Sequence, residues 1–401
     1  MPTKTVFITL LSCIIPAFIL IIPASGEIAF IIVALYSFFY CYQQKINPFT
    51  HSSSRAISFI LITYFGVALL SILASDISIY AFKRLGTNIH FLVAPWLIVL
   101  LSQHLNKNSL NYAIKIGASL AGIIAYVQYF YLAQRAYGTV NAIPFGDIAL
   151  LLSFFSLINI HNETRKQKWV SFFSFCLGCS AVILSLSRGA WITAPFLLVG
   201  LLFIWYKQKS ISLNLVIVLF IMGVIGIGAA SLSPQVQSRL HTAQQDIKIY
   251  EKNSLTSVGT RITLWKTALN AIPSHPILGF GLHNTKQVTA DYIENQEIKK
   301  ALQGFGHFHN EYLTTLVAKG AIGLISLLIL LIAPPVLFFS HLSQPNNSYL
   351  ASLILLLCIG YSFFGLTNLA FGHGIMNTFF VFILSASSGL LNSHKPIANY
   401  P

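Results

Sequence analysis

The chain has 401 residues, of which 55% are hydrophobic and only 8% charged, and its mean hydropathy is +0.73. Soluble domains carry about 25% charged residues, so this composition excludes an ordinary soluble protein and is typical of a polytopic membrane protein. A net charge of +14 would suggest nucleic acid as the partner of a soluble protein. Here Lys and Arg at the cytoplasmic ends of membrane helices account for the charge, and we expect no nucleic-acid partner.

Twelve apolar stretches have the length of membrane helices, and the sequence therefore predicts an all-α polytopic fold. The first stretch has the look of a signal peptide, but its length and the spans that follow favour an uncleaved helix. The predicted spans are residues 5–23, 27–43, 56–75, 86–103, 110–133, 146–161, 168–187, 189–206, 211–232, 311–340, 349–367 and 373–391.

Basic residues in the short connections predict the orientation of these spans. With the N-terminus inside, ten Lys and Arg residues fall on the cytoplasmic side and four in short outer loops, as the positive-inside rule requires. Both termini are then cytoplasmic. Residues 1–232 form nine spans, 311–401 form three, and 233–310 form a large outer segment with helices predicted at 234–252, 261–272 and 285–302.

Arg188 is the first candidate for chemistry, because it lies between two spans with almost no loop, in LSLSRGAW. Charges that run against the positive-inside bias need a functional reason or an anionic partner. The planar guanidinium suits phosphate oxygens, while snorkelling of the side chain to the interface is the alternative.

Three further charged residues belong to the same outer side. Arg261, in SVGTRITLW, is expected at a helix start, where backbone N–H groups and a guanidinium together bind anions. Arg135 lies in a Gly- and Pro-containing outer loop with Asp147 near its end. Arg135 is a candidate anion ligand and Asp147 a candidate sugar or arginine ligand, and a local ion pair between the two explains them equally well. Lys83 and Arg84 are weaker candidates that interfacial placement explains.

Two histidines stand where the tenth span begins, in GHFHNEYL. Asn310 is a candidate N-cap, and the helix dipole and nearby arginines favour a neutral imidazole at His309, which is the state of a general base. His307 is assigned to packing or to holding the loop. A metal pair is disfavoured because no further ligands are evident. Lys319, one third of the way along the span, needs a cavity or a partner.

Four groups of residues carry a resemblance to a known family. The chain resembles the O-antigen ligase and O-antigen polymerase family from Arg135 onward, in SRGAW at 187–191, GTR-x₃-W at 259–265, HPILGFG at 275–281, and HNEYL at 309–313 followed by KGAIG. Members are integral transferases of the bacterial inner membrane with about twelve helices and a large periplasmic loop, and they resemble GT-C glycosyltransferases.

The resemblance implies a reaction and roles for three residues. The donor is a glycan on undecaprenyl diphosphate, the acceptor of the ligases is a sugar hydroxyl of lipid A–core, and no metal or other cofactor takes part. Arg188 and Arg261 resemble the arginines that hold the diphosphate, and His309 resembles the catalytic histidine. Arg135 is grouped with the diphosphate ligands, and Lys319, Asp147, His307 and Asn310 are expected to support the site.

Three alternatives to an O-antigen ligase remain open at this point. An O-antigen polymerase is hard to separate from one sequence. A protein O-oligosaccharyltransferase is expected to have a longer chain with an extra periplasmic domain. A transporter of the same lipid predicts charges in mid-span and repeated halves, whereas the polar residues here gather on the outer side.

Overall fold

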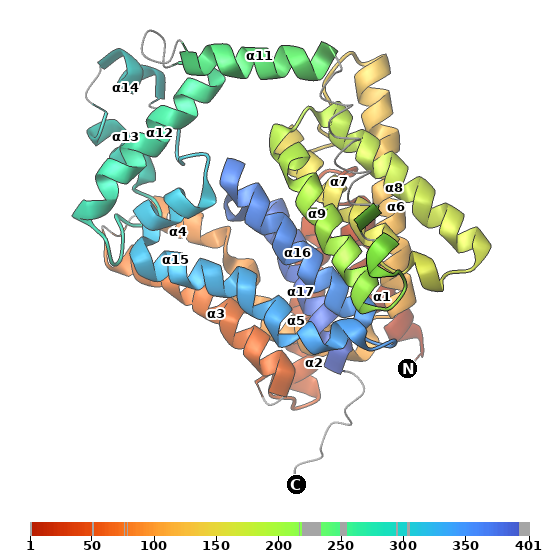
Figure 1. Cartoon of the computed structure of the whole chain (residues 1–401). Coiled ribbons are helices and arrows are strands. Elements are labelled where there is room, and N and C mark those ends of the chain that lie inside the picture. The colour runs from red at the N-terminus through yellow and green to blue at the C-terminus, as the bar shows by residue number, and fades with distance from the viewer. Residues whose placement is uncertain are drawn as a thin grey trace.

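The computed structural model describes residues 2–49, 52–75, 77, 79–215, 217–218, 234–248, 255–293, 296–302 and 305–392. The described chain is helical, with short 3₁₀ and π turns and no strand (Figure 1). Its α-helices are α1 (Pro2–Phe18), α2 (Ser25–Gln43), α3 (Ser52–Leu73), α4 (Ile79–Gly86), α5 (Ile89–His104), α6 (Lys107–Tyr126), α7 (Ala142–Leu157), α8 (Arg165–Ser185), α9 (Arg188–Lys207), α11 (Pro234–Lys248), α12 (Ser257–Ala271), α13 (Thr285–Asp291), α14 (Gln296–Leu302), α15 (Glu311–Leu337), α16 (Ser348–Thr367) and α17 (Gly374–Asn392).

Ten helical stretches of the described chain are long and apolar enough to cross a membrane, so the prediction of an all-α polytopic membrane protein is confirmed. The first predicted span is shorter than expected: α1 ends at Phe18, and the chain turns before Pro23. The predicted span at 86–103 is longer, because α4 and α5 together form one stretch from Ile79 to His104. Most of the ninth predicted span, 211–232, lies outside the described residues.

Two helices form the centre of the bundle. Both α7 and α17 are buried along nearly their whole length, and α16 packs against both. Because these helices touch protein on every side, their sequences are apolar all round rather than amphipathic. One continuous hydrophobic core joins them to α1, α2, α3, α5 and α6. This core fixes the ends of the helices that carry the candidate site residues.

The helices α11, α12, α13 and α14 form a layer of short helices at one end of the bundle (Figure 1). It has a small core of its own, which includes Leu264 and Ala268 of α12, Phe308 of the loop before α15, and Val317 of α15. The single helix predicted over 285–302 is wrong, since α13 ends at Asp291 and α14 begins only at Gln296. The layer is thus anchored on the membrane domain through α12 and the start of α15.

Helix α15 is interrupted one third of the way along its length. Gly320 has φ 63° and ψ −162°, a conformation outside the helical region. The HPILGFG segment lies against this break: Phe280 N donates to Val317 O at 2.8 Å, and Ala321 N donates to Pro276 O at 2.8 Å. Backbone groups freed at membrane depth must find partners inside the protein, so two distant sequence motifs satisfy one another's hydrogen bonds here.

Gly279 is the position where this contact tolerates no side chain. Its φ is 70°, and a Cβ there would lie 2.5 Å from Ala318 C and Lys319 N. We expect Gly279→Ala to lower the free energy of unfolding by roughly 1–3 kcal/mol, through overpacking and a strained backbone. Thermal unfolding of the purified protein in detergent measures this, with Gly66→Ala as the control because nothing lies within 4 Å of a Cβ at Gly66. An equal melting temperature for both variants would contradict the role given to the break.

Candidate active site

The loop that carries the two histidines is held from three directions. Trp265 Nε1 of α12 donates to Phe308 O at 3.0 Å, and Phe308 N donates to Thr314 Oγ1 of α15 at 3.1 Å. Thr285 Oγ1 of α13 donates to Gly306 O at 2.7 Å. Phe308, which lies between the two histidines in the sequence, has a fully buried side chain. The backbone on both sides of each imidazole is therefore fixed before any substrate binds.

Helix α15 begins directly after this loop, as predicted. Asn310 is its N-cap, with Oδ1 accepting from Leu313 N at 3.0 Å, so the predicted cap is confirmed. Asn310 Nδ2 also donates to Leu366 O at 3.3 Å, near the end of α16. His309 has φ 49°, a left-handed conformation that His tolerates better than most residues.

Both imidazoles favour the neutral form. Their ring centroids are 4.5 Å apart. Burial, His309, His373 and Arg84 together lower the pKa of His307 to about 4. Burial and then the charge of Arg261 lower the pKa of His309. The Nδ1 atom of His309 is buried without a partner in the described chain. A neutral imidazole is equipped to accept a proton.

Arg261 lies beside His309, but not at a helix start as predicted. Helix α12 begins four residues earlier at Ser257, capped by Thr256, whose Oγ1 accepts from Gly259 N at 3.1 Å. Arg261 is therefore in the second turn, and its side chain rather than the first backbone N–H groups faces the site. Burial and then the charge of Arg188 lower the pKa of the half-buried Arg261.

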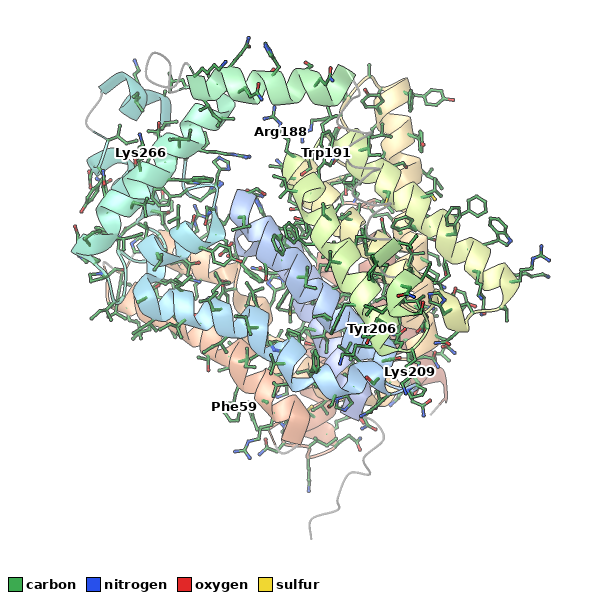
Figure 2. All side chains as sticks on the ribbon, in the orientation of Figure 1. Phe59, Arg188, Trp191, Tyr206, Lys209 and Lys266 are labelled. Atoms are coloured by element: carbon green, nitrogen blue, oxygen red, sulfur yellow. The ribbon has the colours of Figure 1, made fainter. Side chains whose placement is uncertain are left out.

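Arg188 is the first residue of α9, and the predicted junction without a loop is confirmed (Figure 2). Helix α8 ends at Ser185, and Leu186 turns the chain with φ 55°. Trp191 Nε1 donates to Val182 O at 3.3 Å and ties the two helices together. At Gly189 a Cβ would lie 2.3 Å from Thr367 Oγ1, so the glycine lets α16 approach. The SRGAW motif thus fixes a guanidinium at a helix N-terminus.

The two guanidinium groups repel one another without a carboxylate between them. Within the described ranges the one salt bridge is Lys115–Glu163, far along the chain from this site. A positive charge at the first residue of a helix is also opposed by the helix dipole. Both costs are removed by an anion, which the α9 N-terminus and the two planar guanidinium groups would bind together. The arrangement is an anion site beside a neutral imidazole.

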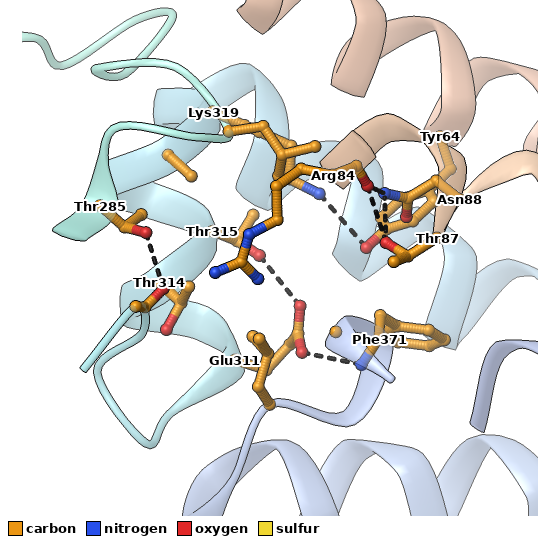
Figure 3. A pocket seen from close by; sticks show the side chains of 15 residues that line it. Tyr64, Arg84, Thr87, Asn88, Thr285, Glu311, Thr314, Thr315, Lys319 and Phe371 are labelled. Atoms are coloured by element: carbon orange, nitrogen blue, oxygen red, sulfur yellow. Dashed lines mark hydrogen bonds between the residues drawn. The ribbon is translucent and has the colours of Figure 1, made fainter. Parts of the chain in front are cut away.

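A small recess adjoins the histidine loop at Gly306 (Figure 3). Lys319 is buried here, and its Nζ donates to Tyr64 Oη of α3 at 3.2 Å. The buried lysine therefore has the partner that we expected for it. Glu311 accepts from Phe371 N at 2.9 Å and from Thr315 Oγ1 at 3.3 Å. Arg84 of α4 extends into the same recess.

Comparison with known proteins identifies the family. A family model described as O-antigen ligase matches residues 172–328. An uncharacterized protein of Haemophilus influenzae is 30% identical over 337 residues, which cover 82% of this chain and 84% of the relative. The chain belongs to the O-antigen ligase family.

Two named relatives are more distant. The O-antigen ligase of Escherichia coli is 22% identical over 56% of this chain and 54% of its own length. The ComP-specific O-oligosaccharyltransferase of Acinetobacter baylyi is 26% identical over 63% of this chain and 48% of its own length. The chain thus spans about half the length of the named relatives it matches. The region that matches the O-antigen ligase model contains Arg188, Arg261 and His309 but not Arg84 or Arg135.

Arg135 and Asp147 of this O-antigen ligase family member lie in different environments. Arg135 is exposed, and its Nε donates to Ser185 O at 3.1 Å. Asp147 is buried within α7, and its Oδ1 has no partner in the described chain. No ion pair joins Arg135 to Asp147 in the part of the chain that the structure describes, so that alternative is wrong. Arg135 contacts the turn between α8 and α9, at a residue three positions before Arg188.

Sequence reasoning missed three contributors to the site. Arg84, His373 and Glu311 all lie near the histidine loop. Burial and then the charge of Arg84 lower the pKa of His373. Interfacial placement accounts for Arg84 in the sequence, and its position next to an outer loop is the one local sign of a role in the site. In the described ranges no three His, Cys, Asp or Glu side chains are arranged to hold a metal ion.

Proposed function

We propose that this protein is an O-antigen ligase that transfers a glycan from undecaprenyl diphosphate to a sugar hydroxyl of lipid A–core. The observation that carries the proposal is the pair of guanidinium groups, Arg188 and Arg261, which repel one another beside the neutral His309. A diphosphate leaving group requires cationic stabilisation, and a sugar hydroxyl requires a base, so the two halves of the site match the two halves of the reaction.

The chemical step follows from these groups. Nε2 of His309 accepts the proton of the acceptor hydroxyl as its oxygen attacks the anomeric carbon of the donor glycan. The bond from that carbon to the diphosphate oxygen breaks, and the electron pair leaves with the undecaprenyl diphosphate, whose charge Arg188 and Arg261 stabilise. A single displacement inverts the anomeric configuration. No step in this account uses a metal ion, and the mechanism is that of a GT-C-like transferase.

The reaction is placed on the periplasmic face of the bacterial inner membrane. The bias of ten against four basic residues in short segments supports this orientation, with residues 233–310 periplasmic and both termini cytoplasmic. The same bias of basic residues supports the division of the chain into a first membrane part (residues 1–232), a periplasmic segment (233–310) and a second membrane part (311–401).

Cysteine labelling tests the orientation. In a background without the five native cysteines, a cysteine at exposed position Lys286 should react with an impermeant maleimide added to intact spheroplasts. A cysteine at exposed position Arg165 should react only after the membrane is opened. The reverse pattern would overturn the orientation, and labelling of both after lysis is the control for accessibility.

A protein O-oligosaccharyltransferase is the second candidate, because the Acinetobacter baylyi relative with that name is 26% identical against 22% for the Escherichia coli O-antigen ligase. An O-antigen polymerase is the third. Deleting the gene separates all three. Loss of a ligase leaves bare core and polymerised glycan on the polyprenyl diphosphate. Loss of a polymerase leaves core with one repeat unit, and loss of the protein transferase leaves lipopolysaccharide unchanged and a protein unglycosylated.

A further inference from the structure

The recess at α4 and α15 contains an arginine that the proposed reaction does not use. The guanidinium of Arg84 makes no salt bridge within the described chain, and it lies against Gly306 of the histidine loop. A Cβ at Gly306 would be 2.6 Å from Arg84 Nη2, so the glycine makes room for the guanidinium. Figure 3 shows the side chain of Arg84 reaching into the recess toward Thr315 and Glu311.

The other charges of the recess are already bound. Glu311 is buried and accepts hydrogen bonds from Phe371 N and Thr315 Oγ1. Lys319 is buried against Tyr64, with Nζ 3.2 Å from the hydroxyl and 4.3 Å from the ring centroid. Two cations therefore face one carboxylate, and the recess carries an excess positive charge. The guanidinium N–H groups of Arg84 are therefore left to donate hydrogen bonds to a ligand.

The recess and the donor arginines adjoin different histidines of the loop. The charge of Arg261 lowers the pKa of His309, and the charge of Arg188 lowers the pKa of Arg261. The His307 ring is 4.5 Å from that of His309, and His307 lies within electrostatic reach of Arg84. Arg261 thus adjoins His309, whereas Arg84 adjoins His307. In an in-line displacement the attacking hydroxyl and the leaving diphosphate lie on opposite sides of the anomeric carbon. With Arg188 and Arg261 assigned to the diphosphate, Arg84 is assigned to the acceptor.

The geometry points to Arg84 as a specificity-determining residue that binds an anionic substituent of the acceptor glycan, a phosphate or a carboxylate, in this recess. The inference rests on the proposed function for its assignment to the acceptor. A planar guanidinium binds either anion in a bidentate manner, and Lys319 adds a second positive charge to the recess.

Steady-state kinetics of the purified protein in nanodiscs test the inference. The acceptors are intact lipid A–core, phosphatase-treated lipid A–core, and lipid A–core with reduced carboxyl groups. We expect Arg84→Ala to raise KM for the intact acceptor by about 10–100-fold, because a hydrogen-bonded charge contact is lost. KM for the polyprenyl diphosphate donor should stay within about twofold. Arg84→Lys should recover only part of the loss, since lysine lacks the planar fork.

The modified acceptors identify the anion. With one of the two modified acceptors, KM of the wild-type protein should rise by the same factor. KM of Arg84→Ala should rise no further with that acceptor. Lys83→Ala is the matched control, because Lys83 is the exposed neighbour with equal charge, and it should leave both KM values unchanged. An increase in KM for the donor alone would place Arg84 on the diphosphate and overturn the inference. Equal use of all three acceptors by the wild-type protein would also overturn it.

A binding measurement without donor separates this inference from the proposed function. Core oligosaccharide released from lipid A is titrated into the purified protein by calorimetry. Weaker binding to Arg84→Ala than to the wild type supports the subsite even if no transfer is found. Unchanged binding together with wild-type transfer would refute the subsite and leave the proposed function intact.

Discussion

Replacing His309 by alanine is expected to lower the rate of glycan transfer by roughly 10²–10⁴ while the polyprenyl diphosphate donor still binds. The loss follows because His309 is the imidazole beside the donor arginine Arg261. Burial and the charge of Arg261 keep the imidazole neutral, so the residue is already in the state that accepts a proton. Initial rates and donor binding, measured on the same nanodisc preparation, give the two quantities.

The pH dependence separates a base from a cationic ligand. The pKa of His309 is lowered from 6.5, so the imidazole is deprotonated at neutral pH. If His309 acts as a base, kcat should fall only as the pH drops through that lowered pKa. A cationic diphosphate ligand would lose activity as the pH rises. His307→Ala should reduce transfer less than His309→Ala does. His241→Ala, an exposed histidine of α11, should change nothing. Near wild-type transfer by His309→Ala, or failure through lost donor binding alone, would remove the base assignment.

Arg188→Ala and Arg261→Ala should each reduce transfer by roughly 10²–10³, because each removes a charge that stabilises the leaving diphosphate. The variants should remain folded, since removing one guanidinium relieves its repulsion of the other. Arg→Lys should restore little, because the ammonium keeps the charge but not the bidentate contact. Transfer rates and donor KM are measured for each variant, with melting temperature as the check on folding.

The matched control for the arginines is Lys266→Ala, which removes an exposed charge from the same helix as Arg261 (Figure 2). Its rate should stay within about twofold of the wild type. Full activity in either arginine variant would exclude that arginine from the donor site. A melting temperature that falls together with activity would assign the arginine to folding instead.

The parts of the site that could be predicted from the sequence are those set by local patterns. Hydropathy fixed most of the spans, and the helix junction at Arg188 followed from two apolar stretches that almost touch. The N-cap Asn310 followed from its position before a long apolar helix. Each of these features depends on residues within one or two helical turns.

The parts that could not be predicted depend on contacts between distant segments. The break at Gly320 exists because the segment around Gly279 binds the freed backbone, and no local pattern of α15 signals it. The split of the helix predicted over 285–302 follows from packing on the small core around Phe308. Arg84 looked like an interfacial charge because its partner, Gly306, is more than two hundred residues away in the chain.

The most direct test of the central claim is a reconstituted transfer reaction with purified protein, undecaprenyl diphosphate–linked glycan and lipid A–core. The account predicts that glycan appears on lipid A–core with inverted anomeric configuration while one undecaprenyl diphosphate is released for each transfer. It also predicts that His309→Ala yields neither product at a comparable rate. Glycan that lengthens on the undecaprenyl diphosphate while lipid A–core stays bare would contradict the account and show a polymerase.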